Sequence, residues 1–170
     1  MKLRNDRTSV VVLAFDLGRN VGTCAGSTGA NAVVQTWNLP QLVGPMMASF
    51  EGKVRAQVEE YDPDVIAFER PVVPFGRGSR NTVKHMYTAF GQASVLLKIA
   101  SQNDIVAVDY AAKSVRKTIV GSGKATSEQI ITGCVKMGFS PSDDHSADAI
   151  LVWAATKMDI KIGKFTPLKI

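Results

Sequence analysis

The stretch SVVVLAFDLG (residues 9–18) decides the fold of the chain, because it joins a continuous apolar run to an acidic turn. An unbroken run of β-branched and apolar residues is typical of a strand that is buried on both faces of a sheet. The run ends at Asp16. A charged carboxylate at the edge of a core is costly unless it is paired or bound to a cation. The stretch therefore predicts a strand over 9–15 that is buried on both faces and is followed directly by a candidate functional acid.

The hydrophobic pattern that follows predicts a mixed α/β architecture. Strands over 23–27 and 32–37 come next around a Thr-Gly turn, which is typical of an antiparallel meander. Helices and strands then alternate, over 42–61 (helix), 64–69 (strand), 82–99 (helix), 104–109 (strand), and 111–118, 125–137 and 140–158 (helices), with Ser140 as the N-cap of the last. This order implies a five-stranded mixed sheet, with antiparallel and parallel pairs, and helices on both faces.

Length and composition predict one domain from a reducing compartment. At about 100–200 residues per domain, the 170 residues make a single domain over 1–170, with a core at about 9–158 and a tail at 159–170. No window approaches the roughly 20 uncharged apolar residues of a membrane span. Cys24 and Cys134 lie far apart and outside any metal-ligand spacing. We therefore expect two free thiols, no membrane contact and a cytoplasmic location.

Positive charge is concentrated in the middle of the chain. The net charge is +5, yet residues 70–124 hold nine basic and only two acidic side chains. A basic region between acidic flanks suits a polyanion such as nucleic acid. A solvated basic face without a partner is the alternative.

Four side chains are candidates for a metal site. Asp16 and Glu69 each end an apolar strand, and His145 and Asp148 are three apart on one face of a helix. Asp144 is a candidate substitute for His145. Oxygen-rich clusters suit Mg²⁺ or Mn²⁺. Two such ions, held about 3.5–4 Å apart, can activate a water and stabilise the leaving oxygen of a phosphodiester.

Each candidate also has an ordinary structural explanation. Asp16, which precedes Leu-Gly, can be a turn-forming residue. Glu69 can form a surface ion pair with Arg70, and His145 can be a first-turn residue without a role. These explanations would all have to hold together, and the strand-end positions of the two acids argue against that.

Four blocks of sequence, in order, carry a family resemblance over about residues 10–157. They are FDLGRNVG (15–22), VIAFE (65–69), DYAAKSVRKTIVGSG (109–123) and HSADAI (145–150). Together they resemble the motifs of the RuvC-type Holliday-junction resolvases, members of the RNase H-like superfamily. The third block is the most specific of the four.

This resemblance implies a fold, a reaction and an assembly. The fold is RNase H-like, and Asp16, Glu69, His145 and Asp148 hold two Mg²⁺ ions, with Mn²⁺ able to substitute. The enzyme cuts four-way junctions or other branched DNA symmetrically, and leaves 5′-phosphate and 3′-hydroxyl ends. The resemblance also implies a homodimer that forms through the helix around 82–99. The two-fold symmetry of the dimer matches that of the junction.

The resemblance also implies DNA-binding residues. The family places an aromatic side chain after the second acid, where it stacks on unpaired bases, and the candidate here is Phe75. Arg116 stands where the family has a phosphate-contacting lysine, and Ser127 replaces a second such lysine. The further basic candidates are Arg77, Arg80, Lys84, Lys113, Lys117 and Lys124.

Three other readings compete with a junction resolvase. The nearest is an RNA-processing nuclease of the same superfamily, of the YqgF or RNase H type. A sugar-kinase-like ATPase shares the opening motif but needs two such domains. A non-catalytic branched-DNA-binding module would have a basic surface without an intact acid set. The short chain and the unusual loop after Glu69 favour a phage member, acting in the cytosol of its host, over a bacterial one.

Overall fold

The computed structural model describes residues 9–29, 32–72 and 80–168. Its elements follow the expected order, with bounds that differ by a few residues. They are β1 (Val11–Asp16), β2 (Asn20–Ser27), β3 (Val33–Asn38), α1 (Val43–Tyr61), β4 (Val65–Glu69), α2 (Arg80–Gln102), β5 (Val106–Tyr110), α3 (Ala112–Val120), α4 (Ser127–Lys136) and α5 (Asp144–Lys161).

The five strands form one mixed sheet in the order β3-β2-β1-β4-β5. β1 pairs antiparallel with β2, and β2 pairs antiparallel with β3. β4 lies parallel to β1 on its other side, and β5 lies parallel to β4. The predicted mixed sheet is therefore confirmed, with β1 at its centre.

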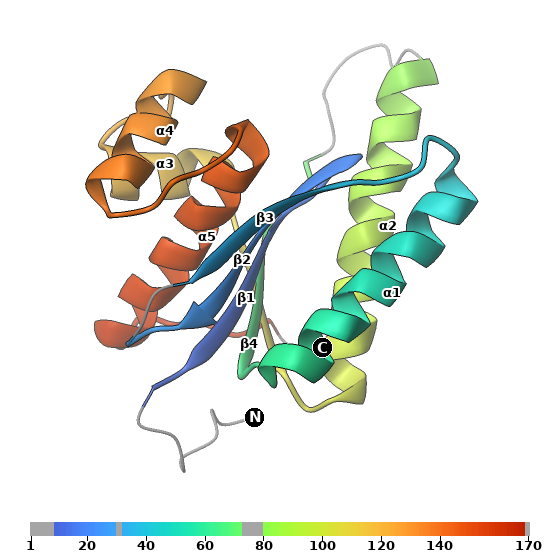
Figure 1. Cartoon of the computed structure of the whole chain (residues 1–170), viewed down its shortest axis with the longest axis horizontal. Helices are drawn as coiled ribbons and strands as arrows, with labels where there is room; N and C mark the ends of the chain where they lie inside the picture. The colour runs from blue at the N-terminus through green and yellow to red at the C-terminus, as the bar shows by residue number, and fades with distance from the viewer. Residues whose placement is uncertain (1–8, 30–31, 73–79, 169–170) are drawn as a thin grey trace.

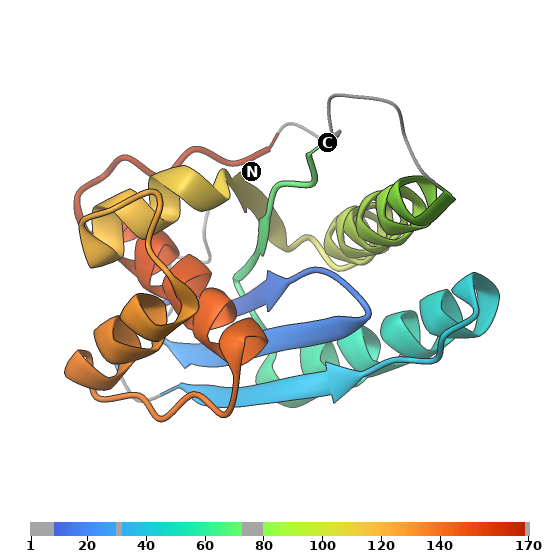
Figure 2. The same ribbon diagram turned by 90° about the horizontal axis from the view of Figure 1, so that it is seen from above.

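Helices cover both faces of the sheet, as expected. α1 and α2 lie on one face, and α5, with α3 and α4 beside it, lies on the other (Figure 1, Figure 2). The buried apolar side chains divide accordingly into two clusters. The α1–α2 cluster contains Leu13, Phe15, Phe50, Ile66 and Leu96 among others, and the α5 cluster contains Val12, Ala14, Val65, Ile150 and Leu151 among others. Alternate residues of β1 thus belong to opposite clusters.

The last helix begins later than expected. Ser140 is not its N-cap, because Asp143 takes that position with an extended backbone. The Asp143 carboxylate accepts a hydrogen bond from the Ser146 backbone N–H at 2.8 Å, and the Ser146 hydroxyl accepts one from the Asp143 N–H at 3.1 Å. The Thr36 hydroxyl of β3 also donates to Asp143 at 2.7 Å. This reciprocal capping box and the tie to the sheet outweigh the serine-proline signal three residues earlier.

The residues after α5 contact the open edge of β5. The backbone N–H of Leu168 donates to the carbonyl of Ala107 at 2.8 Å. Phe165 packs against the α5 cluster and Leu168 against the α1–α2 cluster. Because an edge strand presents unpaired backbone groups, this segment covers part of the edge.

Two further expectations concern cysteines and membranes. Cys24 and Cys134 are both buried free thiols, as predicted. None of the helices in the described ranges is long and apolar enough to cross a membrane.

Phe50→Ala should test the packing of α1 on the sheet. Phe50 is fully buried and makes edge-to-face contacts with Phe15 and Trp37. Removing the ring should lower the free energy of unfolding by about 3–5 kcal/mol, measured by urea denaturation. Val135→Ala, at an exposed position of α4, should change it by less than about 0.5 kcal/mol. Equal losses for the two variants would contradict the assigned packing.

Candidate active site

Asp16 and Glu69 lie side by side at the carboxyl edge of the sheet. β1 and β4 are parallel, and Phe15 pairs with Phe68, so each acid directly follows a paired position. Both phenylalanines belong to the α1–α2 cluster. Because successive side chains point to opposite faces of a strand, both carboxylates point to the face that carries α5.

Asp109, another acid near the end of a strand, lies on the other face. Its neighbour Val108 belongs to the α5 cluster, so Asp109 points away from that face. There its carboxylate accepts hydrogen bonds from Arg70, at 2.6 Å from Nη2 and 2.9 Å from Nε. The pairing of Arg70 with Asp109 leaves the proposed ion pair between Arg70 and Glu69 without support.

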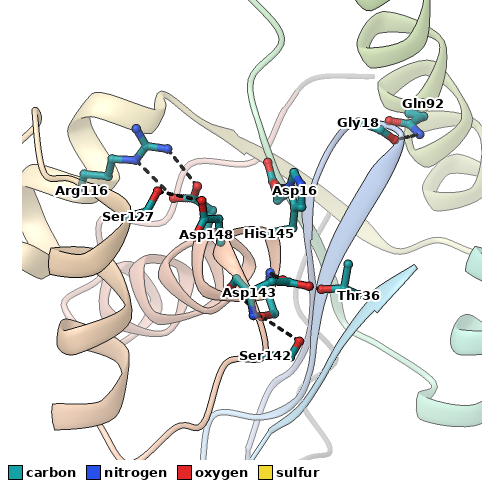
Figure 3. Close-up of polar contacts among 12 residues, drawn as sticks. Asp16, Gly18, Thr36, Gln92, Arg116, Ser127, Ser142, Asp143, His145 and Asp148 are labelled. Atoms are coloured by element: carbon teal, nitrogen blue, oxygen red, sulfur yellow. Dashed lines mark hydrogen bonds and ion pairs between the residues drawn. The ribbon is translucent and has the colours of Figure 1, made fainter. Parts of the chain in front are cut away.

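His145 reaches Asp16 from the first turn of α5. Its Nδ1 lies 2.9 Å from Asp16 Oδ2 (Figure 3). The approach depends on Gly22, which pairs with Asp16 in the sheet. A Cβ at position 22 would lie 1.8 Å from the backbone oxygen of His145. The missing side chain at Gly22 therefore lets the start of α5 lie directly against the sheet and brings His145 to Asp16.

Asp148 is held by an arginine. Arg116 of α3 donates two hydrogen bonds to its carboxylate, at 3.2 Å from Nε and 2.9 Å from Nη2 (Figure 3). The side chain expected to contact a DNA phosphate is thus turned into the acid cluster. Asp144, the candidate substitute for His145, instead accepts a hydrogen bond from the Ser127 hydroxyl at 2.8 Å. Its carboxylate is directed to α4.

Burial and mutual repulsion raise the pKa values of both strand-end acids. Burial is the main cause for Asp16, whose pKa is raised although His145 hydrogen-bonds to it. The pKa of Glu69 is raised to about 7, first by burial and then by the charges of Asp16 and Asp148. The hydrogen bond to Asp16 is the main reason that the pKa of His145 is raised. Near neutral pH the site therefore carries less negative charge than three free carboxylates would.

The donor set fits a divalent cation, but its present arrangement does not. Three carboxylates and an imidazole are ligands that Mg²⁺ and Mn²⁺ accept. Within the described ranges, however, no three His, Cys, Asp or Glu side chains are arranged so that they could hold a metal ion. Asp148 faces Arg116, and Asp16 faces His145. A cation would have to exchange with these partners.

A cavity of about 210 Å³ opens beside the two strand-end acids. It is lined by Asp16 and Glu69 on one side and by residues of α2, including His85 and Thr88, on another. Both acids therefore border a cavity that lies between the end of the sheet and α2.

Gln92 was not expected from the sequence as part of this region. It is fully buried in α2, and its Nε2 donates to the carbonyl of Gly18 at 2.7 Å (Figure 3). The turn that follows Asp16 is thereby tied to α2. A glutamine four residues before Leu96, on the buried stripe of the helix, was the signal that could have indicated it.

Of the remaining predicted DNA-binding residues, only four lysines have side chains within the described part of the chain. Phe75 and Arg77 lie outside the described residues, and Arg80 is the first residue of α2. The lysines are exposed at the start of α2, on α3 and in the turn before α4, at Lys84, Lys113, Lys117 and Lys124.

Comparison with known proteins identifies related sequences. The family model described as "Crossover junction endodeoxyribonuclease RuvC" matches residues 29–156. A protein of that name from Corynebacterium diphtheriae is 36% identical over 100 residues, which are 57% of this chain and 58% of the relative. The chain spans about half the length of the curated relatives it matches.

Solved structures share the fold. Thermus thermophilus RuvC in complex with a Holliday junction substrate matches 94% of this chain and 99% of its own, with a TM-score of 0.77 and 18% identity. The yeast mitochondrial Holliday junction resolvase matches 90% of this chain and 81% of its own, with a TM-score of 0.58 and 16% identity. The expected RNase H-like architecture is thus confirmed.

Gly22→Ala should separate His145 from Asp16. The added Cβ would collide with the backbone of α5, and overpacking of this kind costs about 1–3 kcal/mol of unfolding free energy. Loss of the contact with Asp16 should also lower the pKa of His145, measured by NMR titration. Gly52→Ala, where nothing lies within 4 Å of the added Cβ, should do neither. A wild-type pKa of His145 in Gly22→Ala would contradict the assigned close approach.

Glu69→Gln should stabilise the protein at alkaline pH. The folded Glu69 carboxyl keeps its proton up to a pKa of about 7, whereas the ordinary value is 4.5. The wild type therefore loses stability as the pH rises from about 4.5 through 7, because the unfolded chain releases this proton first. The variant lacks this loss, so its unfolding free energy relative to wild type should rise by about 1–3 kcal/mol between pH 4.5 and 8. Denaturation in chelator would measure this, and a pH-independent difference would contradict it.

Proposed function

The chain belongs to the RuvC family of crossover junction endodeoxyribonucleases, and on this premise we propose that it is a metal-dependent endonuclease that resolves four-way DNA junctions. The observation that carries the proposal is the convergence of Asp16, Glu69, His145 and Asp148 from β1, β4 and α5. Carboxylates are concentrated there at a cost in repulsion, which is typical of a catalytic site.

The reaction is hydrolysis of a backbone phosphodiester by water, leaving 5′-phosphate and 3′-hydroxyl ends. Asp16, Glu69, Asp148 and His145 would hold two Mg²⁺ ions. The bound ions supply charge neutralisation at the phosphate and a lowered pKa of the attacking water. In the free protein the imidazole of His145 holds the Asp16 carboxylate through their 2.9 Å contact. The raised pKa of Glu69 means that ion binding would release a proton from this carboxyl near neutral pH.

DNA would approach the acids across the basic surface of α2, α3 and the turn before α4. Exposed lysines at positions 84, 113, 117 and 124 can bind backbone phosphates without reading sequence. Phe75, with Arg77 and Arg80, remains the predicted aromatic and basic contact to unpaired bases at the crossover.

We further propose a homodimer through α2. Val83, Tyr87 and Phe90 are 45%, 69% and 40% exposed on one face of this helix. Together with Met86, Gly91 and Ser94 they line an apolar cavity of about 440 Å³. In a two-fold dimer the same face of both copies would meet, and the pair would present two acid clusters to the two strands that must be cut.

Asp16→Asn should separate binding from cutting. The amide cannot replace the carboxylate, so nicking of a labelled four-way junction in Mg²⁺ should fall at least about 100-fold, measured on a denaturing gel. Binding in chelator should be at least as tight as that of the wild type, since one negative charge is removed. Glu59→Gln, an exposed acid on α1, should cut at the wild-type rate. Undiminished cutting by Asp16→Asn would contradict the catalytic role, and cutting of RNA–DNA hybrid alone would favour an RNA-processing enzyme.

Tyr87→Glu should dissociate the dimer. A charge in the centre of an apolar interface is costly to bury, so light scattering should report the monomer mass of 18.3 kDa for the variant and twice that mass for the wild type. Val135→Glu, on the exposed face of α4, should stay dimeric. The same mass for both variants and the wild type would contradict an interface at α2.

A further inference from the structure

Arg116 is the positive side chain that enters the acid cluster from α3. Its two hydrogen bonds engage both oxygens of Asp148, at 3.2 Å and 2.9 Å. The two side chains are only 29% and 16% exposed. A fork of two N–H donors on a carboxylate is the strongest common form of an ion pair in proteins. Arg116 is therefore paired and partly buried in this position and is not a free surface cation.

This pair affects what Asp148 can bind. A guanidinium against the carboxylate repels a second cation and uses the lone pairs that would bind it. The guanidinium stays protonated at any physiological pH, so its charge leaves only when the side chain changes partner. A cation can therefore bind Asp148 only if Arg116 has another partner to which its side chain can move.

A DNA phosphate is the natural second partner. Phosphate oxygens accept the same two-pronged contact as a carboxylate. Lys113 and Lys117 are exposed on the same helix, so a phosphate bound by α3 would lie within the range of its basic side chains. In the free protein, Arg116 pairs with Asp148 in place of the phosphate contact that the sequence predicts for it.

We propose that Arg116 is an exchangeable counter-ion of the acid cluster. In the free protein it holds Asp148, and on DNA binding it moves to a backbone phosphate and releases Asp148 for a divalent cation. The proposal rests on the proposed junction-binding function. Since binding free energies are reciprocal, DNA and metal must each strengthen the binding of the other.

The pairing of Arg116 with Asp148 in the free protein predicts that removing Arg116 changes the affinity for metal in the absence of DNA. Arg116→Gln should bind Mn²⁺ more tightly than the wild type, by about threefold to tenfold, because no ion pair has to open first. Free Mn²⁺ would be counted by electron paramagnetic resonance. Arg116→Lys, which keeps the charge but not the fork, should fall between the two. Lys136→Gln removes one charge from an exposed position of α4 and should match the wild type.

The movement of Arg116 from Asp148 to a phosphate predicts that the loss of its partner Asp148 strengthens DNA binding. Binding is measured in chelator so that the DNA is not cut. Asp148→Asn frees Arg116 and should tighten junction binding about threefold more than Asp16→Asn, which removes the same charge from the cluster but leaves the Arg116 pair. In an Arg116→Gln background this extra gain should vanish. Circular dichroism would establish that each variant is folded.

Two results would overturn the exchange. One is an Arg116→Gln protein with wild-type or weaker Mn²⁺ affinity, and the other is a gain from Asp148→Asn that persists without Arg116. Either result, with junction binding intact, would leave the proposed function standing. Loss of junction preference in the wild type itself would instead refute the proposed function.

Discussion

The parallel pairing of β1 with β4 forces two carboxylates together at the edge of a buried core. Phe15 and Phe68 pair and point to one face, so Asp16 and Glu69 must point to the other as neighbours. Neither acid can turn away without exposing a phenylalanine to water. Burial, and then the charges of Asp16 and Asp148, raise the pKa of Glu69, and the surrounding structure has to compensate for this crowding of acids.

An imidazole and a guanidinium provide this compensation, and each depends on a helix. α5 brings His145 to Asp16 because Gly22 lets the helix start lie against β2. α3 brings Arg116 to Asp148. On the opposite side, Gln92 of α2 holds the turn after β1. The helix proposed to form the dimer is thus bonded to the turn that follows a proposed catalytic acid.

The fold, and the positions of the candidate acids at strand ends and on one helix face, were predictable from local patterns. An unbroken apolar strand that ends on Asp16, and the spacing of His145 and Asp148 on one helix face, depend only on the periods of strands and helices. The partners of these acids were not predictable. Arg116 and Arg70 pair with carboxylates that lie far from them in the sequence and close only in the folded chain. The start of α5 at Asp143 likewise depends on Thr36 of β3. The contact of Leu168 with β5 carries no sequence signal at all.

The most direct test of this account is the location of the metal. Crystals of the protein with a four-way junction and Mn²⁺ would be measured for anomalous scattering. We expect Mn²⁺ among the carboxylates of Asp16, Glu69 and Asp148, next to a junction phosphate, with Arg116 turned away from Asp148. Mn²⁺ bound only elsewhere, with Asp148 still paired to Arg116, would contradict the assignment of these acids as the metal-dependent active site.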